Sequence, residues 1–197
     1  MFALTPCAAG CGRYALTGAP VCAIHAADPH KEALRIADYI TGRERIKDLN
    51  APGLTFENID FSRRRFFGCN FTRSSFSRCS FGESFMRMSF FDFSHFHECD
   101  FSKSDLQFLS FGGASMLNCT FEGSELVHAN FGGATITECL FNNSNLYNSR
   151  FINSELYSSD FINCNIKKTY FITAKQEGIS FKSSNTAEAI FEYGEEV

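Results

Sequence analysis

Phenylalanine recurs at every fifth position along much of this chain, a period that neither a helix nor a strand has. The segment CNFTRSSFSRCSF, residues 69–81, places Phe71, Phe76 and Phe81 in this register. A helix repeats at about 3.6 residues and a strand at about 2, so a period of five must belong to a larger unit that turns a corner at each repeat. The pattern therefore predicts a solenoid in which five residues form one side of a coil.

The register continues without an insertion from Phe56 to Phe171, with Phe, Leu, Met or Ile at every fifth position. A small residue, usually Ser, Cys or Ala, stands two positions before most of these repeat centres. Strand alternation points the small residue and the centre inward and the residue between them outward. The pattern is imperfect at the ends, where Arg64 falls on an inward position and Gln176 and Thr186 fall on centres.

Four corners close a square, so about 20 residues form one coil, and neighbouring coils stack about 4.8 Å apart. Two opposite faces of this square then carry columns of Phe that form the predicted core. Its members are Phe61, Phe71, Phe81, Phe91, Phe101, Phe111, Phe121, Phe131, Phe141, Phe151, Phe161 and Phe171. Each buried ring contributes about 1.5–3 kcal/mol to stability.

A small residue, a polar residue, Leu or Phe and two variable positions make up the pattern of the pentapeptide-repeat family, which residues 54–183 resemble. The resemblance implies an all-β fold, a right-handed quadrilateral parallel β-helix of about seven coils. The predicted organisation is a zinc-binding knuckle at 1–27, a capping helix and linker at 28–53, the β-helix at 54–183 and a C-terminal cap at 184–197.

Nine cysteines are present, and six of them occupy small inward positions of the repeat. These six are Cys69, Cys79, Cys99, Cys119, Cys139 and Cys164. Stacked side chains point in parallel and not toward one another, so we expect unreactive core thiols and no disulfides.

The other three cysteines lie before the repeat, where Cys7, Cys11, Cys22 and His25 form a C-x3-C pair and a C-x2-H pair. Three thiolates and one imidazole are a ligand set typical of tetrahedral Zn²⁺. Four protein ligands leave no open position, so we expect one structural zinc ion. A reduced, cysteine-rich loop without metal is the alternative.

A capping helix is predicted after this segment, because Asp28-Pro29 is typical of a helix N-terminus and Gly42 of a C-terminus. Its apolar positions Leu34, Ile36 and Ile40 follow a helical period. We expect this helix to cover the first coil and hide its strand edges.

Six large apolar residues fall off the repeat centres in the amino-terminal half of the repeat. They are Phe67, Phe85, Met88, Phe90, Phe93 and Phe108, here called the aromatic patch. Exposed apolar clusters usually mark a contact surface. The contact is either an external protein or the chain's own zinc module or helix folding back over the patch; the sequence favours the latter.

Charge is segregated along the repeat, although the net charge is only −4. Residues 63–87, the basic end, hold six Arg and one Glu, whereas residues 98–160, the acidic shaft, hold eight acids against two bases. Such segregation is either an ordinary solvated surface or a field that steers a partner. His95 and His97 point outward together, which fits two solvated histidines better than a metal site.

The sequence contains no enzyme signature such as a phosphate-binding loop or a nucleophile elbow. We therefore expect a non-catalytic protein-binding scaffold, cytoplasmic, without direct binding to nucleic acid or membrane, and either monomeric or dimeric through a solenoid end. The alternative is a DNA mimic. Quinolone-resistance members of the family are thought to occupy the DNA site of gyrase, and seven coils form a rod of about 34 Å.

Overall fold

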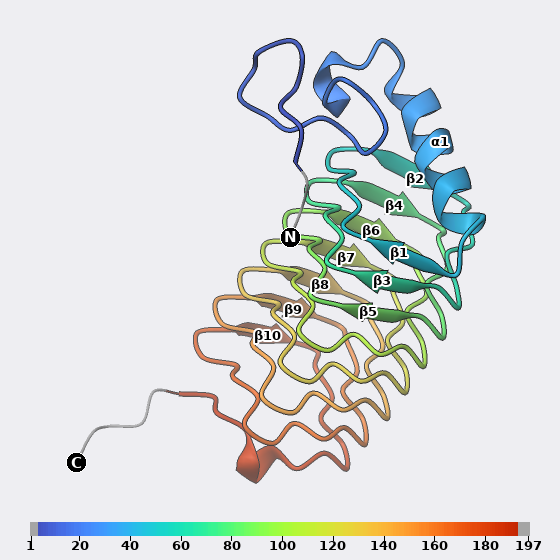
Figure 1. The fold of residues 1–197 in the computed structure, drawn as a ribbon. Coiled ribbons are helices and arrows are strands. Elements are labelled where there is room, and N and C mark those ends of the chain that lie inside the picture. Colours follow the sequence, from blue (N-terminus) through green and yellow to red (C-terminus); the bar gives the residue numbers. More distant parts are fainter. Residues whose placement is uncertain (1–3, 193–197) are drawn as a thin grey trace.

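A computed structural model describes residues 4–192, which form a long stack of coils with a small module and one α-helix at its amino-terminal end (Figure 1). Residues 1–3 of the predicted knuckle and residues 193–197 of the predicted C-terminal cap lie outside the described residues. The expected β-solenoid is confirmed.

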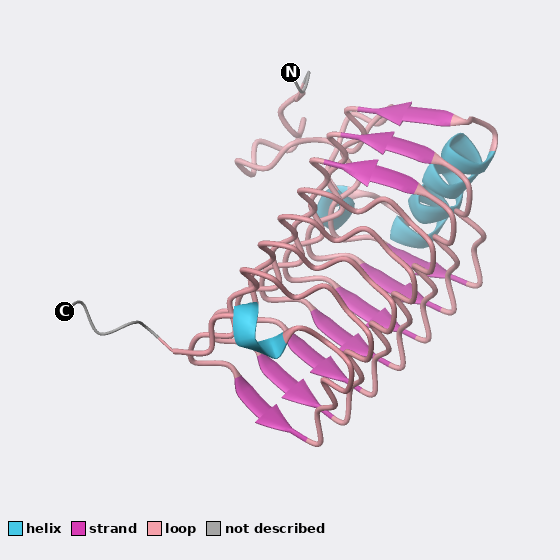
Figure 2. Cartoon of the chain, turned by 90° about the horizontal axis from the view of Figure 1, so that it is seen from below, coloured by secondary structure: helices cyan, strands magenta, loops and turns pink. Residues whose placement is uncertain are grey.

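The helical elements are η1 (Ala23–His25), α1 (Pro29–Thr41) and η2 (Thr186–Glu188). The strands, each three residues long, are β1 (Arg45–Lys47), β2 (Thr55–Glu57), β3 (Arg65–Phe67), β4 (Ser75–Ser77), β5 (Phe85–Arg87), β6 (His95–His97), β7 (Ser115–Leu117), β8 (Thr135–Thr137), β9 (Glu155–Tyr157) and β10 (Lys175–Glu177). They form two parallel sheets, β1-β3-β5 and β2-β4-β6-β7-β8-β9-β10, on opposite sides of the coil (Figure 2).

Each coil contains 20 residues, as the strand register shows. Ile46 pairs with Phe66, and Phe56 pairs with Phe76, which is 20 residues further in each case. The same offset continues to the carboxyl end, where Leu156 pairs with Gln176. Identical steps of this kind place every fourth repeat on the same face of the coil.

Phenylalanine rings fill the coil interior as two parallel columns, as the repeat predicts. Each of the twelve rings assigned to the core is at most 1 % exposed. Within a column the rings stack, with centroids 4.8 Å apart for Phe101 and Phe121 and 4.7 Å apart for Phe131 and Phe151. Between columns the rings meet edge to face, as Phe121 and Phe131 do at 6.0 Å. Both arrangements are favourable for aromatic pairs.

The small inward residue stabilises the stack through its hydroxyl or thiol. The Ser124 hydroxyl donates to the Phe101 carbonyl at 2.7 Å, and the Ser144 hydroxyl donates to the Phe121 carbonyl at 2.6 Å. Cys164 makes the equivalent contact with the Phe141 carbonyl at 2.9 Å. The residue here must be small to fit beside the ring, and where it is Ser or Cys it also satisfies a buried carbonyl.

The second residue after most repeat centres adopts a left-handed backbone conformation, which turns the corner. Glycine and asparagine accept this conformation readily, as Gly133 and Asn153 do. Met88, Phe93 and Phe108 occupy the same corner position, with φ values of 53°, 58° and 59°. These three large apolar residues are therefore held in a backbone conformation that disfavours them.

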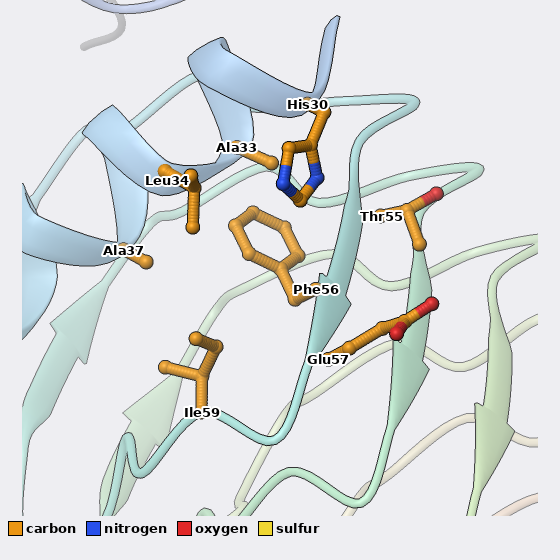
Figure 3. A pocket seen from close by; sticks show the side chains of 8 residues that line it. All are labelled: His30, Ala33, Leu34, Ala37, Thr55, Phe56, Glu57 and Ile59. Carbon is orange, nitrogen blue, oxygen red and sulfur yellow. The ribbon is translucent and has the colours of Figure 1, made fainter.

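Helix α1 covers the amino-terminal end of the stack and lies beside β2 (Figures 1 and 3). The Asp28 side chain accepts from the Lys31 N–H at 3.0 Å, which is the expected N-cap. Ala33, Ile36, Ala37 and Ile40 are buried. Leu34 was predicted on the buried face but is 47 % exposed, because the small alanines bring the helix close to the coil on a slightly rotated face.

Two details differ from or extend the sequence analysis at this end. Strand β1 pairs with β3, so the first paired side of the solenoid lies inside the segment 28–53 that the sequence assigned to helix and linker. Arg64, the charged residue on an inward position, donates through Nη2 to the Thr41 carbonyl at the end of α1. It thus joins the helix to the coil that it covers. Nothing helical within residues 4–192 has the length and apolarity of a membrane-crossing segment.

Candidate metal centre and exposed aromatic patch

Four candidate ligands converge in the N-terminal module, the segment before α1. The ligand atoms of Cys7, Cys11, Cys22 and His25 all lie within 4.8 Å of one another. Cys11 Sγ and Cys22 Sγ are 3.8 Å apart, and His25 Nδ1 lies 3.6 Å from Cys7 Sγ and 3.5 Å from Cys22 Sγ. A tetrahedral ion with Zn–S of about 2.3 Å and Zn–N of about 2.0 Å would separate two sulfurs by about 3.8 Å and sulfur from nitrogen by about 3.5 Å. The cluster can therefore hold a metal ion of this size.

Local backbone structure positions these ligands. Pro6 and Tyr14 form an antiparallel bridge, and the Gly10 N–H donates to the Cys7 carbonyl at 2.9 Å, which folds the first cysteine pair into a tight loop. Gly10 has a φ of 69°, so glycine fits this turn without strain. The short helix η1 then directs His25 back toward Cys22.

The pKa of the Cys11 thiol differs from that of two buried solenoid thiols, Cys69 and Cys164. The backbone N–H of Arg13 lowers the pKa of the Cys11 thiol to about 6, which favours the thiolate that binds metal. Burial raises the pKa of Cys69 and of Cys164 to about 11. These two solenoid cysteines remain protonated at neutral pH, in agreement with a purely structural role.

Asn50 attaches the N-terminal module to the solenoid. Its side-chain amide donates to the Ala15 carbonyl at 2.7 Å, and its backbone N–H donates to the Thr17 hydroxyl at 2.8 Å. Asn70, one coil further, donates to the Asn50 side-chain oxygen at 2.8 Å. Asn50 is only 5 % exposed, so these contacts form a buried joint. Nothing in the repeat pattern marks this residue, because an asparagine at its position is common elsewhere in the chain.

The aromatic patch is largely exposed. Met88, Phe90, Phe93 and Phe108 are 60 %, 41 %, 56 % and 52 % exposed. The expectation that the zinc module or the helix folds back over these residues is therefore wrong for this structure. Helix α1 packs near β2 instead, and Leu4 of the N-terminal module shares a hollow with Phe90.

Cationic side chains accompany the aromatic rings of the patch. Phe67 and Phe85 contact each other with centroids 5.1 Å apart, and the Arg65 guanidinium lies 4.7 Å from the Phe85 centroid. The Arg73 guanidinium lies 5.1 Å from the Phe93 centroid. The patch therefore combines apolar area with positive charge.

Phe108 lies further along the stack than the other residues of the patch. Its ring stacks on His128, one coil further, with centroids 4.9 Å apart. Phe108 and Met88 share a corner column, one coil apart, whereas Phe93 lies on the next corner. The patch is thus a band along two neighbouring corners and not one compact cluster.

Charged residues are distributed as the sequence indicated, with some partly neutralised. Arg87 and Asp105 form an ion pair at 2.7 Å, and Arg63 and Glu83 form one at 3.3 Å. His97 lies 3.8 Å from the Glu98 carboxylate. Within residues 4–192, the N-terminal cluster is the only grouping of three or more potential ligands, so His95 and His97 acquire no further metal-binding neighbour.

Comparison with known proteins agrees with the architecture. A family model described as a pentapeptide repeat region matches residues 114–191. Residues 114–191 of the chain belong to the pentapeptide-repeat family. No curated protein sequence matches it significantly.

Two solved structures are similar to this chain, and the first of them shares its fold. A trypsin-treated form of QnrB1, a plasmid-mediated fluoroquinolone resistance protein, is 21 % identical over 75 % of this chain and 74 % of its own, with a TM-score of 0.60. HetL from the cyanobacterium Nostoc sp. strain PCC 7120, a protein involved in heterocyst differentiation regulation, is 12 % identical. It covers 82 % of this chain and 97 % of its own, with a TM-score of 0.35.

Proposed function

We propose that this pentapeptide-repeat protein is a non-catalytic scaffold that binds a protein partner through the aromatic patch. The supporting observation is the placement of Met88, Phe93 and Phe108. Each is more than half exposed and each occupies a left-handed corner. For a non-glycine residue, the left-handed backbone conformation is about 1–2 kcal/mol less favourable than the right-handed conformation.

The left-handed corner does not require a large apolar side chain, since charged or polar residues such as Arg78, Glu138 and Asn153 turn the same corner elsewhere. Large apolar side chains that neither the corner nor the core requires are candidates for contact with a partner. Exposed apolar area flanked by arginine is typical of protein-binding surfaces. A partner surface that is apolar and carries acidic groups would complement the patch.

Zinc has a structural role in this proposal. Cys7, Cys11, Cys22 and His25 would occupy all four positions of a tetrahedral ion, which leaves none for a substrate or water. When bound, the ion would fix the loop that carries Arg13 and Tyr14 against the first coils. The distances between ligand atoms support zinc over the alternative of a metal-free loop.

The experiment compares native partners captured by the wild-type protein with those captured by the double variant Phe93→Asn/Phe108→Asn. Asparagine tolerates the left-handed corner, so the fold should be retained. Leu140→Ser is the matched control, because Leu140 is 38 % exposed but lies outside the patch. We expect the double variant alone to lose its partner. Capture of the same proteins by all three forms would contradict the proposal.

A second candidate function is the DNA mimicry that the family resemblance implies. It is favoured by the acidic shaft, where Glu122, Glu125, Glu138 and Asp160 take part in none of the ion pairs found within residues 4–192. The net charge of −4 argues against DNA mimicry, because B-DNA carries about one negative charge per 1.7 Å of its axis and is therefore much more negative over the same length.

Gyrase supercoiling distinguishes the two candidates. We expect the protein to leave supercoiling unchanged. Strong inhibition that is abolished by reversing the charges at Glu122, Glu125, Glu138 and Asp160 would instead establish the mimic. The Phe93→Asn/Phe108→Asn variant is the control in that assay, since it leaves the acidic shaft intact.

A further inference from the structure

A groove runs between the N-terminal module and the first coils. Its larger hollow has a volume of about 360 Å³, and its walls come from the module, the start of α1 and two successive coils. A second hollow of about 260 Å³, lined by Leu4 and Phe90, shares Asn70 and Thr72 with the first. The two hollows are therefore adjacent, and together they form a groove that reaches the aromatic patch at Phe90.

The groove is positively charged and apolar. Arg13 and Arg73 line it, no acidic residue does, and neither arginine takes part in an ion pair found within the described part of the chain. Apolar surface comes from Tyr14, which is 50 % exposed, and from Ile24, which is 66 % exposed. Pro29 and Pro52 extend this surface. Such a site fits a ligand that carries both carboxylate groups and large apolar groups.

The asparagine side chains that line the groove already have hydrogen-bond partners within the protein. The side chains of Asn50 and Asn70 are occupied by the contacts that join the module to the solenoid, and the Asn70 side-chain oxygen also accepts from the Thr72 N–H at 3.1 Å. Ligand recognition therefore falls to the two guanidinium groups and the apolar walls. A site of this kind is preorganised, which lowers the entropic cost of binding.

We infer that this groove binds an extended peptide segment of a partner protein, with acidic groups held by Arg13 and Arg73 and large apolar side chains held by the Ile24 wall and by Phe90. The inference rests on the proposed protein-binding function and adds the chemistry of the bound segment. Two adjacent hollows favour an extended chain, which can fill both, over a compact small molecule. Two arginines on a protein with a net charge of −4 favour a few carboxylates over a nucleic acid, whose binding depends on neutralising many phosphates.

Selection from a random peptide library displayed on phage tests the inference with the full chain, metal included, as bait. We expect the enriched peptides to combine Asp or Glu with large apolar residues. Their affinity, measured by fluorescence polarisation on labelled synthetic copies, should fall about tenfold or more in Arg13→Glu and in Arg73→Glu, because each change removes a charge-assisted hydrogen bond. Arg150→Glu is the matched control, since Arg150 is an exposed arginine far from the groove.

A measurement on the unaltered protein guards against variants that fail to fold. Peptides carrying a photoreactive phenylalanine should cross-link to Tyr14, Ile24 or Phe90. Failure of the library to enrich, enrichment without acidic residues, or cross-links confined to Met88 and Phe108 would overturn the inference. Binding of a labelled single-stranded RNA that is lost in Arg13→Glu would overturn it in favour of nucleic acid.

The groove and the proposed function can fail separately. Phe108 does not line either hollow, so Phe108→Asn should leave the selected peptides bound. If native partners depend on the patch but the peptides do not depend on Arg13, only the groove inference fails. If the peptides depend on Arg13 but native partners ignore Phe93 and Phe108, the proposed role of the patch fails instead.

Discussion

Replacing Phe121 with alanine should destabilise the solenoid strongly, because this ring is fully buried and has neighbours on every side. Its centroid lies 4.8 Å from Phe101 and 4.7 Å from Phe141 in its own column. It meets Phe111 and Phe131 of the other column edge to face, at 5.9 and 6.0 Å. Truncating a buried Phe to Ala typically costs about 3–5 kcal/mol. The two stacked neighbours are themselves held by the coil backbones and cannot close the gap, which places the expected loss in the upper half of that range.

Urea unfolding followed by far-UV circular dichroism measures this loss as a change in the free energy of unfolding. Phe93→Ala is the control, since that ring is 56 % exposed and its removal should change stability by less than about 1 kcal/mol. Because a repeat array can lose cooperativity, hydrogen exchange should show whether the coils on either side of Phe121 open separately. A loss below about 1 kcal/mol for Phe121→Ala would mean that the ring is not interior and that the account of the core is wrong.

Three further predictions follow from the same structure. Ser124→Ala should cost about 1–3 kcal/mol because it leaves a buried carbonyl unpaired, whereas Ser149→Ala should be nearly neutral because the Ser149 hydroxyl has no partner; urea unfolding of the two variants decides this. Elemental analysis after chelator-free preparation should give one zinc per chain, and Cys22→Ser should remove it; a metal-free wild type would refute the site. The Ser62 hydroxyl and N–H hold the pKa of Asp60 below its usual value. Its contribution is therefore complete above the unfolded-state pKa of about 3.9 and is lost as pH falls through the lower folded pKa, so Asp60→Asn should flatten the acid side of the stability profile. An unchanged profile would contradict this.

The fold could be predicted from the sequence because a five-residue period leaves few geometric solutions. Each centre, such as Phe121, repeats the environment of the centre 20 residues before it, so one correct coil determines the next. The start of the solenoid was less predictable. Ile46 and Ala51 continue the five-residue register before residue 54, but neither is Phe. Two repeat centres without Phe are hard to tell from a linker in the sequence.

The metal cluster was predictable for a different reason, because its spacing reflects a local loop that closes on itself. The groove was not, since it forms where the module meets the coils through Asn50, and neither the repeat nor the ligand spacing specifies that contact. The sequence favoured a patch covered by the zinc module or the helix, whereas the patch is largely exposed. The position of α1 depends on the packing of Ala33 and Ala37 near β2, which no periodicity in the solenoid reveals.

The construction of the molecule separates its two candidate binding surfaces energetically. In a solenoid each coil contacts only its neighbours, so a change at one coil propagates weakly along the rod. Arg13 and Tyr14 are held by the loop that contains Cys11, and this loop is joined to the first coil through Asn50. Phe108 lies about three coils further, roughly 14 Å along the axis. Losing the metal would therefore loosen one wall of the groove while the corner at Phe108 keeps its shape. A partner that depends on the metal uses the groove, and one that binds equally well without it uses the patch alone.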